Sequence, residues 1–415
     1  MSLSINIKNK IAIVIGSGPT GLHMAQLLSP LFDEVIIVEQ SKDINISPLS
    51  HFPHVRLIKG DRLLTKAFPT LEKELEKENA PITDLNYNFL WETDQGIGKR
   101  QKSNLISVCC SLSLLTRSMK KLVLKNKNVS IRTNKIVTGL NFSRDLRQVV
   151  SVSYKEKNIF GKINGDIIVN ACGPFSNSDK WLSDARIIVP ETITFPWKTH
   201  LTNCTFKFKK TKPNTTSGLI IKQSNPSVQG VIFSPIENDQ ILLSTMEFTE
   251  NSQIDSYLTF QDYLQQFPSD KLKKILKNLI PVSPNINSFD FIENKFIPFK
   301  GENLPTNYFM LGSSYSLFNP ILGLGLTNSF VCNQILQNLI SKHVKTQFDY
   351  ISSTYYRECS TYLMQKFKDI EKFHSRFGKS NQPFKLKNFI LDKSLQLGTH
   401  SAYIHSLHLN KRHLG

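Results

Sequence analysis

A glycine-rich turn near the start of the chain constrains its fold more than any other feature. An apolar run, Ile11–Ile15, leads into the glycine turn Gly16-Ser-Gly-Pro-Thr-Gly21, and an apolar stretch with helical character follows. A second apolar run, Val35–Val38, ends at the acidic residue Glu39. The order is a strand, a turn with glycines at this spacing, a helix, and a second strand that ends in an acidic residue. This order is the dinucleotide-binding fingerprint of a parallel α/β sheet.

Each residue of this fingerprint has a mechanical reason. Gly16 makes the tight turn, Gly18 lets the backbone approach a pyrophosphate, and Gly21 lets the helix pack closely on the strand. The helix N-terminus offers N–H groups and the positive end of a dipole to the phosphates. Glu39, 18 residues after Gly21, can accept hydrogen bonds from ribose hydroxyls. The alternative is an ordinary strand-to-helix turn without a ligand. The predicted dinucleotide contacts are Gly16, Gly18, Pro19, Thr20, Gly21, Glu39 and Gln40.

Length and composition are those of a globular enzyme with a large core. The chain has 415 residues, of which 40% are hydrophobic and 20% charged. It contains no run of 18 apolar residues and no leader-like N-terminal pattern, so we expect no transmembrane segment and a cytoplasmic location. The six cysteines lack a CxxC pair and metal-ligand spacing, which predicts reduced thiols and no metal site.

The chain is strongly basic, with 51 Lys and Arg against 33 Asp and Glu and a net charge of +18. Such a charge attracts acidic partners. In segments such as Lys271–Lys277, however, the lysines alternate with leucines at helical spacing, which is typical of solvated helix faces. Because no nucleic-acid-binding module is present, we expect no nucleic-acid partner, whereas an acidic protein partner stays open.

The hydrophobic pattern divides the chain into a nucleotide domain and an inserted unit. We predict an α/β, Rossmann-like nucleotide-binding domain at 1–190 and 298–345, with an excursion at about 45–105 that includes a helix from about Gly60 to Glu78. Alternating apolar residues predict a mostly antiparallel sheet, the substrate domain, at 191–297. Residues 346–415 are predicted to form a C-terminal helical region.

A second glycine motif lies far along the chain. An apolar strand, Tyr308–Leu311, is followed by Gly312, by the pair Asn319-Pro320, and by Gly323-Leu-Gly325 at the start of a helix. This arrangement resembles the C-terminal flavin motif of FAD-dependent monooxygenases of the aromatic hydroxylase and polyene epoxidase type, in particular a bacterial polyether epoxidase-like branch. The resemblance spans roughly residues 10–340. It implies FAD as cofactor, with further contacts from Arg117, Gly312, Ser313, Pro320, Gly323, Leu324 and Gly325.

The resemblance also implies a reaction. Reduced FAD and O2 would give a flavin C4a-hydroperoxide, which inserts one oxygen atom by epoxidation or hydroxylation into an apolar polyene, polyketide-like or aromatic substrate, a chemistry of natural product biosynthesis. NAD(P)H is the implied external electron donor, and an acidic carrier protein could present the substrate. Phe233, Met246 and Phe248 are candidates for the substrate wall, with plain core packing as the alternative.

The chain departs from the family pattern at several positions. Ser313 stands where the family has an aspartate that holds a ribityl hydroxyl, although a serine hydroxyl still forms one hydrogen bond. The segment Asn170–Pro174 lacks the family arginine, which weakens the case for direct NAD(P)H handling. His54 aligns with a family histidine and is a candidate for the flavin site, with a surface-loop position as the alternative. For Arg117 the alternative is a helix residue that extends into solvent.

Two other functions remain open at this stage. One is an FAD-containing cyclase or isomerase that uses the flavin without redox chemistry, and the other is a non-catalytic flavin-binding partner subunit. Motifs of hydrolases, zinc enzymes, NTPases and dithiol reductases are absent from the sequence, as is the Trp-x-Trp-x-Ile-Pro signature of tryptophan halogenases. The histidines near the C-terminus have no acidic or thiol ligands beside them and are read as a solvated tail.

Overall fold

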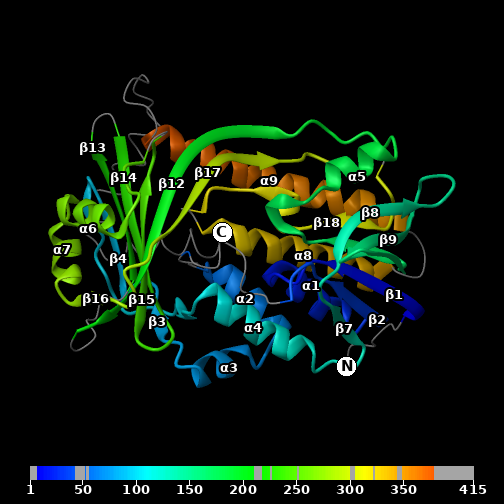
Figure 1. The fold of residues 1–415 in the computed structure, drawn as a ribbon, viewed down its shortest axis with the longest axis horizontal. Helices are drawn as coiled ribbons and strands as arrows, with labels where there is room; N and C mark the ends of the chain where they lie inside the picture. The colour runs from blue at the N-terminus through cyan, green and yellow to red at the C-terminus, as the bar shows by residue number, and fades with distance from the viewer. Residues whose placement is uncertain are drawn as a thin grey trace.

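The structure is a computed structural model that describes residues 7–42, 52, 56–209, 217–224, 227–249, 252–299, 304–320, 323–343 and 348–377. Figure 1 shows an elongated molecule with a parallel sheet in one half and a large antiparallel sheet in the other. The long strand β12 (Ile193–Phe208) and the helix α9 (Phe348–Phe377) extend from one half toward the other. No helix of the described residues is long and apolar enough to cross a membrane.

The first half contains a parallel sheet of five strands in the order β18-β11-β1-β2-β7. Its central strands are buried on both faces, which explains their nearly continuous apolar sequences. All the pairings are parallel, so the carboxyl ends of the strands lie at one edge. The strands are β1 (Ile7–Ile15), β2 (Phe32–Val38), β7 (Val129–Arg132), β11 (Ile167–Asn170) and β18 (Tyr308–Met310).

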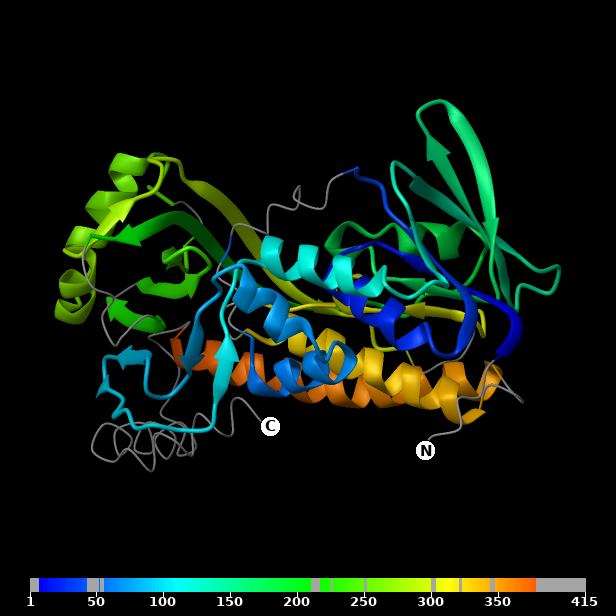
Figure 2. The ribbon, with the colours of Figure 1, turned by 90° about the horizontal axis from the view of Figure 1, so that it is seen from below.

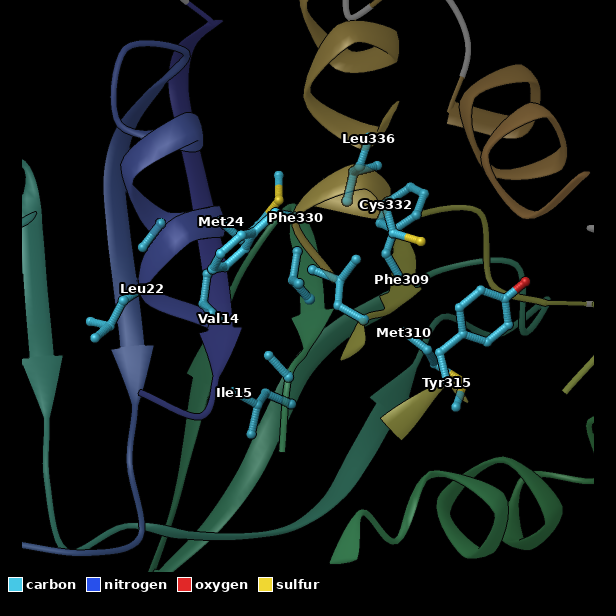
Figure 3. Packing of buried hydrophobic residues seen from close by; sticks show 14 of the residues in the cluster. Val14, Ile15, Leu22, Met24, Phe309, Met310, Tyr315, Phe330, Cys332 and Leu336 are labelled. Atoms are coloured by element: carbon cyan, nitrogen blue, oxygen red, sulfur yellow. The ribbon is translucent and has the colours of Figure 1, made fainter. Parts of the chain in front are cut away.

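Helices α1 (Pro19–Leu28) and α8 (Leu324–His343) pack together beside this sheet. Figure 3 shows side chains from both helices and from β1 and β18 in a single core. Helix α4 (Leu112–Val123) packs on the other side of α1, while α2 (Ile58–Ala67) and α9 pack against α8. A three-stranded antiparallel sheet, β8 (Ile136–Phe142), β9 (Val149–Glu156) and β10 (Ile159–Asn164), precedes β11.

The second half is a nine-stranded, mostly antiparallel sheet, whose main path runs β19-β17-β12-β15-β14-β13-β4-β5. One face is covered by α6 (Tyr257–Gln266) and α7 (Asp270–Leu276), and the other face belongs to the main core. Besides β12, its strands are β4 (Phe89–Thr93), β5 (Gly96–Ile97), β13 (Ser217–Ser224), β14 (Ser227–Ile236), β15 (Gln240–Glu247), β16 (Leu279–Pro281), β17 (Asn287–Phe296) and β19 (Ser316–Leu317). The sheet therefore takes in β4, β5 and β19, which lie outside the predicted limits 191–297.

The excursion at about 45–105 differs from the prediction. The single helix expected from about Gly60 to Glu78 is wrong, because the chain forms two helices, α2 and α3 (Leu71–Lys77). The helix breaks at Phe68, since the following Pro69 disfavours helical backbone in the residue before it and cannot donate a helical hydrogen bond. A short antiparallel pair, β3 (Ile82–Asp84) and β6 (Ile106–Val108), completes this segment.

The predicted C-terminal region is represented by α9, which is part of the main core. The hydroxyls of Tyr355 and Tyr356 donate hydrogen bonds to the carbonyls of Met310 and Tyr308, at 2.7 and 2.9 Å. These bonds tie α9 to the edge strand β18 of the parallel sheet. The C-terminal histidines noted in the sequence lie outside the described residues.

Candidate functional site

The glycine turn between β1 and α1 is shaped by close backbone contacts. Gly16 has a φ of +101°, a conformation that favours glycine, and a Cβ there would lie 2.5 Å from the carbonyl oxygen of Ala171. A Cβ on Gly21 would lie 2.0 Å from the carbonyl oxygen of Gly16. The predicted mechanical roles of these two glycines are confirmed: one makes the turn and the other allows helix and strand to pack.

Gly18 differs from its neighbours because a Cβ there would meet nothing within 4 Å. It is the N-cap of α1, and no side chain caps the helix. The first turn of α1 therefore presents backbone N–H groups and the positive end of its dipole beside an open space. This arrangement fits the diphosphate of a dinucleotide.

The acid predicted to hold a ribose closes the same turn. Glu39 Oε2 accepts hydrogen bonds from the backbone N–H and the hydroxyl of Ser17, both at 2.8 Å, and Oε1 accepts one from the N–H of Ser41. These donors fix the orientation of the carboxylate at the carboxyl end of β2. A carboxylate has about four acceptor positions, so Oε1 can still accept a hydrogen bond from a ribose hydroxyl. Gln40 follows as an exposed residue.

The second glycine motif lies directly against the first. Gly312, with a φ of +61°, follows β18, and a Cβ there would lie 3.0 Å from Thr20 Oγ1 and 3.1 Å from Ser329 Oγ. Thr20 belongs to the first turn of α1 and Ser329 to α8. The side chain of Asn333 on α8 also donates to the carbonyl of Thr20 at 2.9 Å. The two motifs, nearly 300 residues apart in sequence, therefore meet at one edge of the parallel sheet.

The loop that follows Gly312 is anchored to the nine-stranded sheet. Its short strand β19 pairs with β17. Buried Asn319 donates from its backbone N–H to Asn294 Oδ1 at 2.7 Å and from its side chain to Thr199 Oγ1 at 2.8 Å. Thr199 and Asn294 lie on β12 and β17. Pro320 is exposed at this junction, so the loop forms the seam between the two halves of the molecule.

The start of α8 resembles the start of α1 in its open surroundings. A Cβ on exposed Gly325 would meet nothing within 4 Å, and Gly323 and Leu324 beside it are half-buried. The helix is 20 residues long, so the positive end of its dipole lies at this loop. Such a position suits the edge of a flavin ring, where negative charge gathers on reduction. Ser313, in place of the family aspartate, is half-buried at the preceding turn.

A buried histidine that the sequence did not single out joins the two helices. The Nδ1 of His23 on α1 lies 3.0 Å from Asn333 Nδ2, and its ring packs against Phe330 with centroids 4.5 Å apart. Burial lowers the pKa of His23 to about 4, despite an opposing contact with the Leu63 backbone. The ring is therefore neutral at physiological pH. No local sequence pattern indicates this joint, because His23 and Asn333 lie 310 residues apart.

One other predicted FAD contact, Arg117, lies on the surface of α4. Arg117 is an exposed residue of α4, and its guanidinium lies 3.2 Å from the carboxylate of Glu78, which gives it the solvent-exposed position that was the alternative. This ion pair connects α4 to the end of α3 and involves no residue of either glycine motif. His54 lies outside the described residues.

The three candidates for the substrate wall lie on opposite faces of the nine-stranded sheet. Phe233 is fully buried in the cluster beneath α6 and α7, which agrees with the alternative of plain core packing. Strand alternation directs Phe233 away from the main core. Met246 and Phe248 face the main core. Phe248 stacks on Trp197 at 5.5 Å, and His374 of α9 lies 4.7 Å from the same indole.

Metal chemistry finds no support within the described ranges, where no group of three or more His, Cys, Asp or Glu side chains could hold a metal ion. The cysteines there are free, and burial raises the pKa of Cys172, beside the glycine turn, to about 12, with the nearby Glu39 adding to the effect. Cys172 is therefore a neutral thiol. These observations leave the glycine motifs as the chemically distinctive feature of the site.

Solved structures with a similar fold include flavin-dependent enzymes. A scan of protein families and a search of curated proteins give no match for this chain. Among solved structures, the flavin-dependent brominase Bmp2 superposes with a TM-score of 0.68 and 15% identity, over 88% of this chain and 86% of Bmp2. The p-nitrophenol 4-monooxygenase PnpA from Pseudomonas putida DLL-E4 gives 0.71 and 11%, over 97% and 96% of the two chains.

A third similar structure is PqsL, a probable FAD-dependent monooxygenase from Pseudomonas aeruginosa, with a TM-score of 0.65 and 15% identity over 96% of this chain and 99% of PqsL. This is the fold of flavin-dependent monooxygenases and halogenases. The expected fold class is thereby confirmed in its coarse form, a mixed α/β structure of the flavin monooxygenase type.

Proposed function

We propose that this chain is an FAD-dependent monooxygenase that inserts one oxygen atom from O2 into an apolar substrate, by epoxidation or hydroxylation. The observation that carries the proposal is the meeting of the two glycine motifs, with Gly312 packed between Thr20 and Ser329. The extended dinucleotide FAD can contact both motifs at once. When bound, FAD would supply the activation of O2, with electrons from NAD(P)H as external donor.

The protein residues divide the work of holding this cofactor. The N-terminus of α1, with the open space next to Gly18, would bind the diphosphate. Glu39 would accept a hydrogen bond from a ribose hydroxyl. The N-terminus of α8 at Gly325 would stabilise negative charge on the reduced ring. Ser313 would supply one hydrogen bond to the ribityl chain.

One face of the nine-stranded sheet would form an apolar wall beside the substrate. The face toward the main core carries Met246, the stacked pair of Trp197 and Phe248, and the nearby ring of His374. This face is connected to the flavin loop through Thr199 and Asn319. An apolar wall beside the reacting ring excludes water, which a monooxygenase requires to protect its oxygen-transfer step. A polyene, polyketide-like or aromatic substrate fits such a wall, and an acidic carrier could present it.

The test begins with the purified protein and added FAD. We expect a yellow complex whose visible flavin absorbance is bleached by NADH or NADPH in the absence of oxygen. Air should restore nearly all of that absorbance. Incubation with candidate polyenes and phenols under ¹⁸O2 should then give products that carry one labelled oxygen. Bromide is included in a parallel reaction.

The outcomes separate the candidate functions. Labelled product supports the monooxygenase. A yellow protein that no reductant couples to product formation contradicts it and favours the cyclase or partner-subunit alternatives. Brominated product without labelled oxygen would instead indicate halogenation, the activity named for Bmp2. A protein that binds no FAD would overturn all of these functions.

A further inference from the structure

A groove of about 400 Å³ opens between α2 and α8, away from both glycine motifs. Figure 2 shows the two helices side by side, α2 in blue and α8 in gold. The α2 wall carries Lys59, Arg62 and Lys66, which share one helix face because they are spaced by three and four residues. Among the described residues that line the groove, none is acidic.

The acid nearest in sequence does not neutralise this wall. Asp61 of α2 has a side chain only 12% exposed, and it pairs with the buried guanidinium of Arg56 and accepts a hydrogen bond from Ser107. Its charge is thus committed to the interior. Asp61 therefore does not line the groove, although it is the only acidic residue of α2.

The floor of the groove is apolar. Leu63 from α2 and Val331 and Ile335 from α8 are half-buried there, and the two α8 residues lie one helical turn apart. The opposite rim carries amides, with Gln334 Nε2 bonded to Asn338 Oδ1 at 3.0 Å. The groove therefore has an apolar floor, one cationic rim and one neutral polar rim.

The cationic rim continues onto α9. Both Lys59 and Lys366 lie over the ring of Tyr362, with their Nζ atoms 5.4 and 5.6 Å from its centroid. Burial lowers the pKa of Lys366, and the charge of Lys59 lowers it further, while Asp369 opposes both. Cations gathered this closely gain stability when an anionic group lies beside them.

We propose that this groove docks an acidic amphipathic helix of a partner protein. Two adjacent helices with an apolar seam are the surface on which a third helix packs, with its apolar side chains spaced by three and four residues along the seam. Glu and Asp on one flank of that helix would meet Lys59, Arg62 and Lys66, which span about 10 Å at 1.5 Å per residue. Arg62, Lys66 and Asn338 are exposed on the rims of the groove, which suits an extended partner rather than an enclosed small molecule.

The sequence makes the end of this chain a poor occupant. Residues 378–415 contain six Lys and Arg and one acid, Asp392. Their charge has the same sign as that of the groove, so a separate acidic protein is the better complement. The proposal does not depend on the oxygenation reaction, because no residue of the groove belongs to the predicted FAD contacts.

The test uses the full chain and a fluorescent 18-residue helical peptide with leucines along one face and glutamates on the flanks. We expect saturable binding that weakens with salt, as for surface charges within a Debye length. The double variant Arg62→Glu/Lys66→Glu should weaken binding by at least about tenfold, and Ile335→Ser by about threefold through the floor. The matched control is Lys271→Glu/Lys274→Glu on α7, which reverses two exposed lysines on another helix and should leave binding unchanged.

Three results would overturn the proposal. One is equal binding of the peptide and a scrambled peptide of the same composition. A second is an equal loss of peptide affinity in the groove variant and in the α7 control, which would show that net charge attracts the peptide nonspecifically. The third is binding to phosphatidylcholine vesicles with phosphatidylglycerol that the groove variant abolishes while it leaves peptide binding intact, which would assign the groove to a lipid surface. Unfolding temperatures within a few degrees of the wild-type value confirm that each variant is folded.

Discussion

The turn Gly16–Gly21 and the loop Gly312–Gly325 lie against each other, yet they are held in different ways. The turn is fixed by close backbone packing, because a Cβ on Gly21 would meet the carbonyl of Gly16 and a Cβ on Gly16 would meet the carbonyl of Ala171. The loop is fixed from a distance, through the contacts of Asn319 with Thr199 and Asn294 on the nine-stranded sheet. Backbone packing thus determines the first motif, and side-chain hydrogen bonds to the nine-stranded sheet determine the second.

The largest effect is expected where backbone packing is closest. Gly21→Val would place Cβ 2.0 Å from the carbonyl oxygen of Gly16, and neither backbone can move away cheaply. We expect a loss of about 4 kcal/mol or more in the free energy of unfolding, measured by urea denaturation. Gly139→Val is the control, because a Cβ on this strand glycine meets nothing within 4 Å. Similar stability in both variants would contradict steric control of the turn.

Gly18→Val separates cofactor binding from folding. The residue has φ −67° and ψ 173°, ordinary extended backbone, and open space at its Cβ, so valine should be tolerated by the fold. The added side chain would fill the space beside the N-terminus of α1. We expect unchanged unfolding and an FAD Kd about 100-fold higher, or about 2.7 kcal/mol, by fluorescence titration. Wild-type FAD affinity in this variant would show that the diphosphate does not bind at this turn.

His23 tests the joint between the two motifs. Its pKa falls to about 4 in the folded protein from 6.5, so the unfolded chain binds more protons between these values. The stability contributed by neutral His23 is therefore present above pH 6.5 and is lost as pH falls toward 4. We expect the wild type to lose about 2 kcal/mol between pH 7.5 and 5 through this residue, and His23→Gln to lack that part, by urea denaturation at both pH values. An equal pH dependence in both proteins would contradict this assignment.

The smallest effect is expected at Ser313. If the loop holds the ribityl chain, Ser313→Asp should restore the family carboxylate and lower the FAD Kd about three- to tenfold. Ser314→Asp is the contrast, because Ser314 Oγ is buried within 2.8 Å of the carbonyl oxygens of Asn170 and Leu311, where a carboxylate would be repelled. Weaker FAD binding in Ser313→Asp would show that the loop does not use this position for the ribityl chain.

The difference between the two motifs also explains what the sequence could predict. The strands β1 and β2, the glycine turn and Glu39 follow local rules, and each was found at its predicted place. The helix predicted to start at Gly323-Leu-Gly325 is α8, which begins at Leu324. It is harder to predict which side of a sheet a strand residue faces. Alternation along β14 shows that Phe233 and its neighbours point to opposite sides, but it does not show which side meets the main core.

Other differences between the sequence-based expectations and the structure arise from contacts that are distant in sequence. Strand β4 joins the nine-stranded sheet by pairing in parallel with β13, more than 120 residues later, which no local pattern indicates. Arg117 was chosen by its place in a motif, whereas its neighbour Glu78 comes from another helix. The joint of His23 and Asn333 likewise depends on how α1 and α8 meet. The roles proposed for the cofactor residues stay predictions until FAD binding is measured.

The nine-stranded sheet is assembled from three separate stretches of chain, β4 and β5, β12 to β17, and β19. A chimera that exchanged only residues 193–296 with a related enzyme would leave two partner edges foreign to the graft, β13 against β4 and β17 against β19. An exchange of this sheet therefore also requires an exchange of the loop that carries β19. Laboratory recombination would have to move all three stretches as one block.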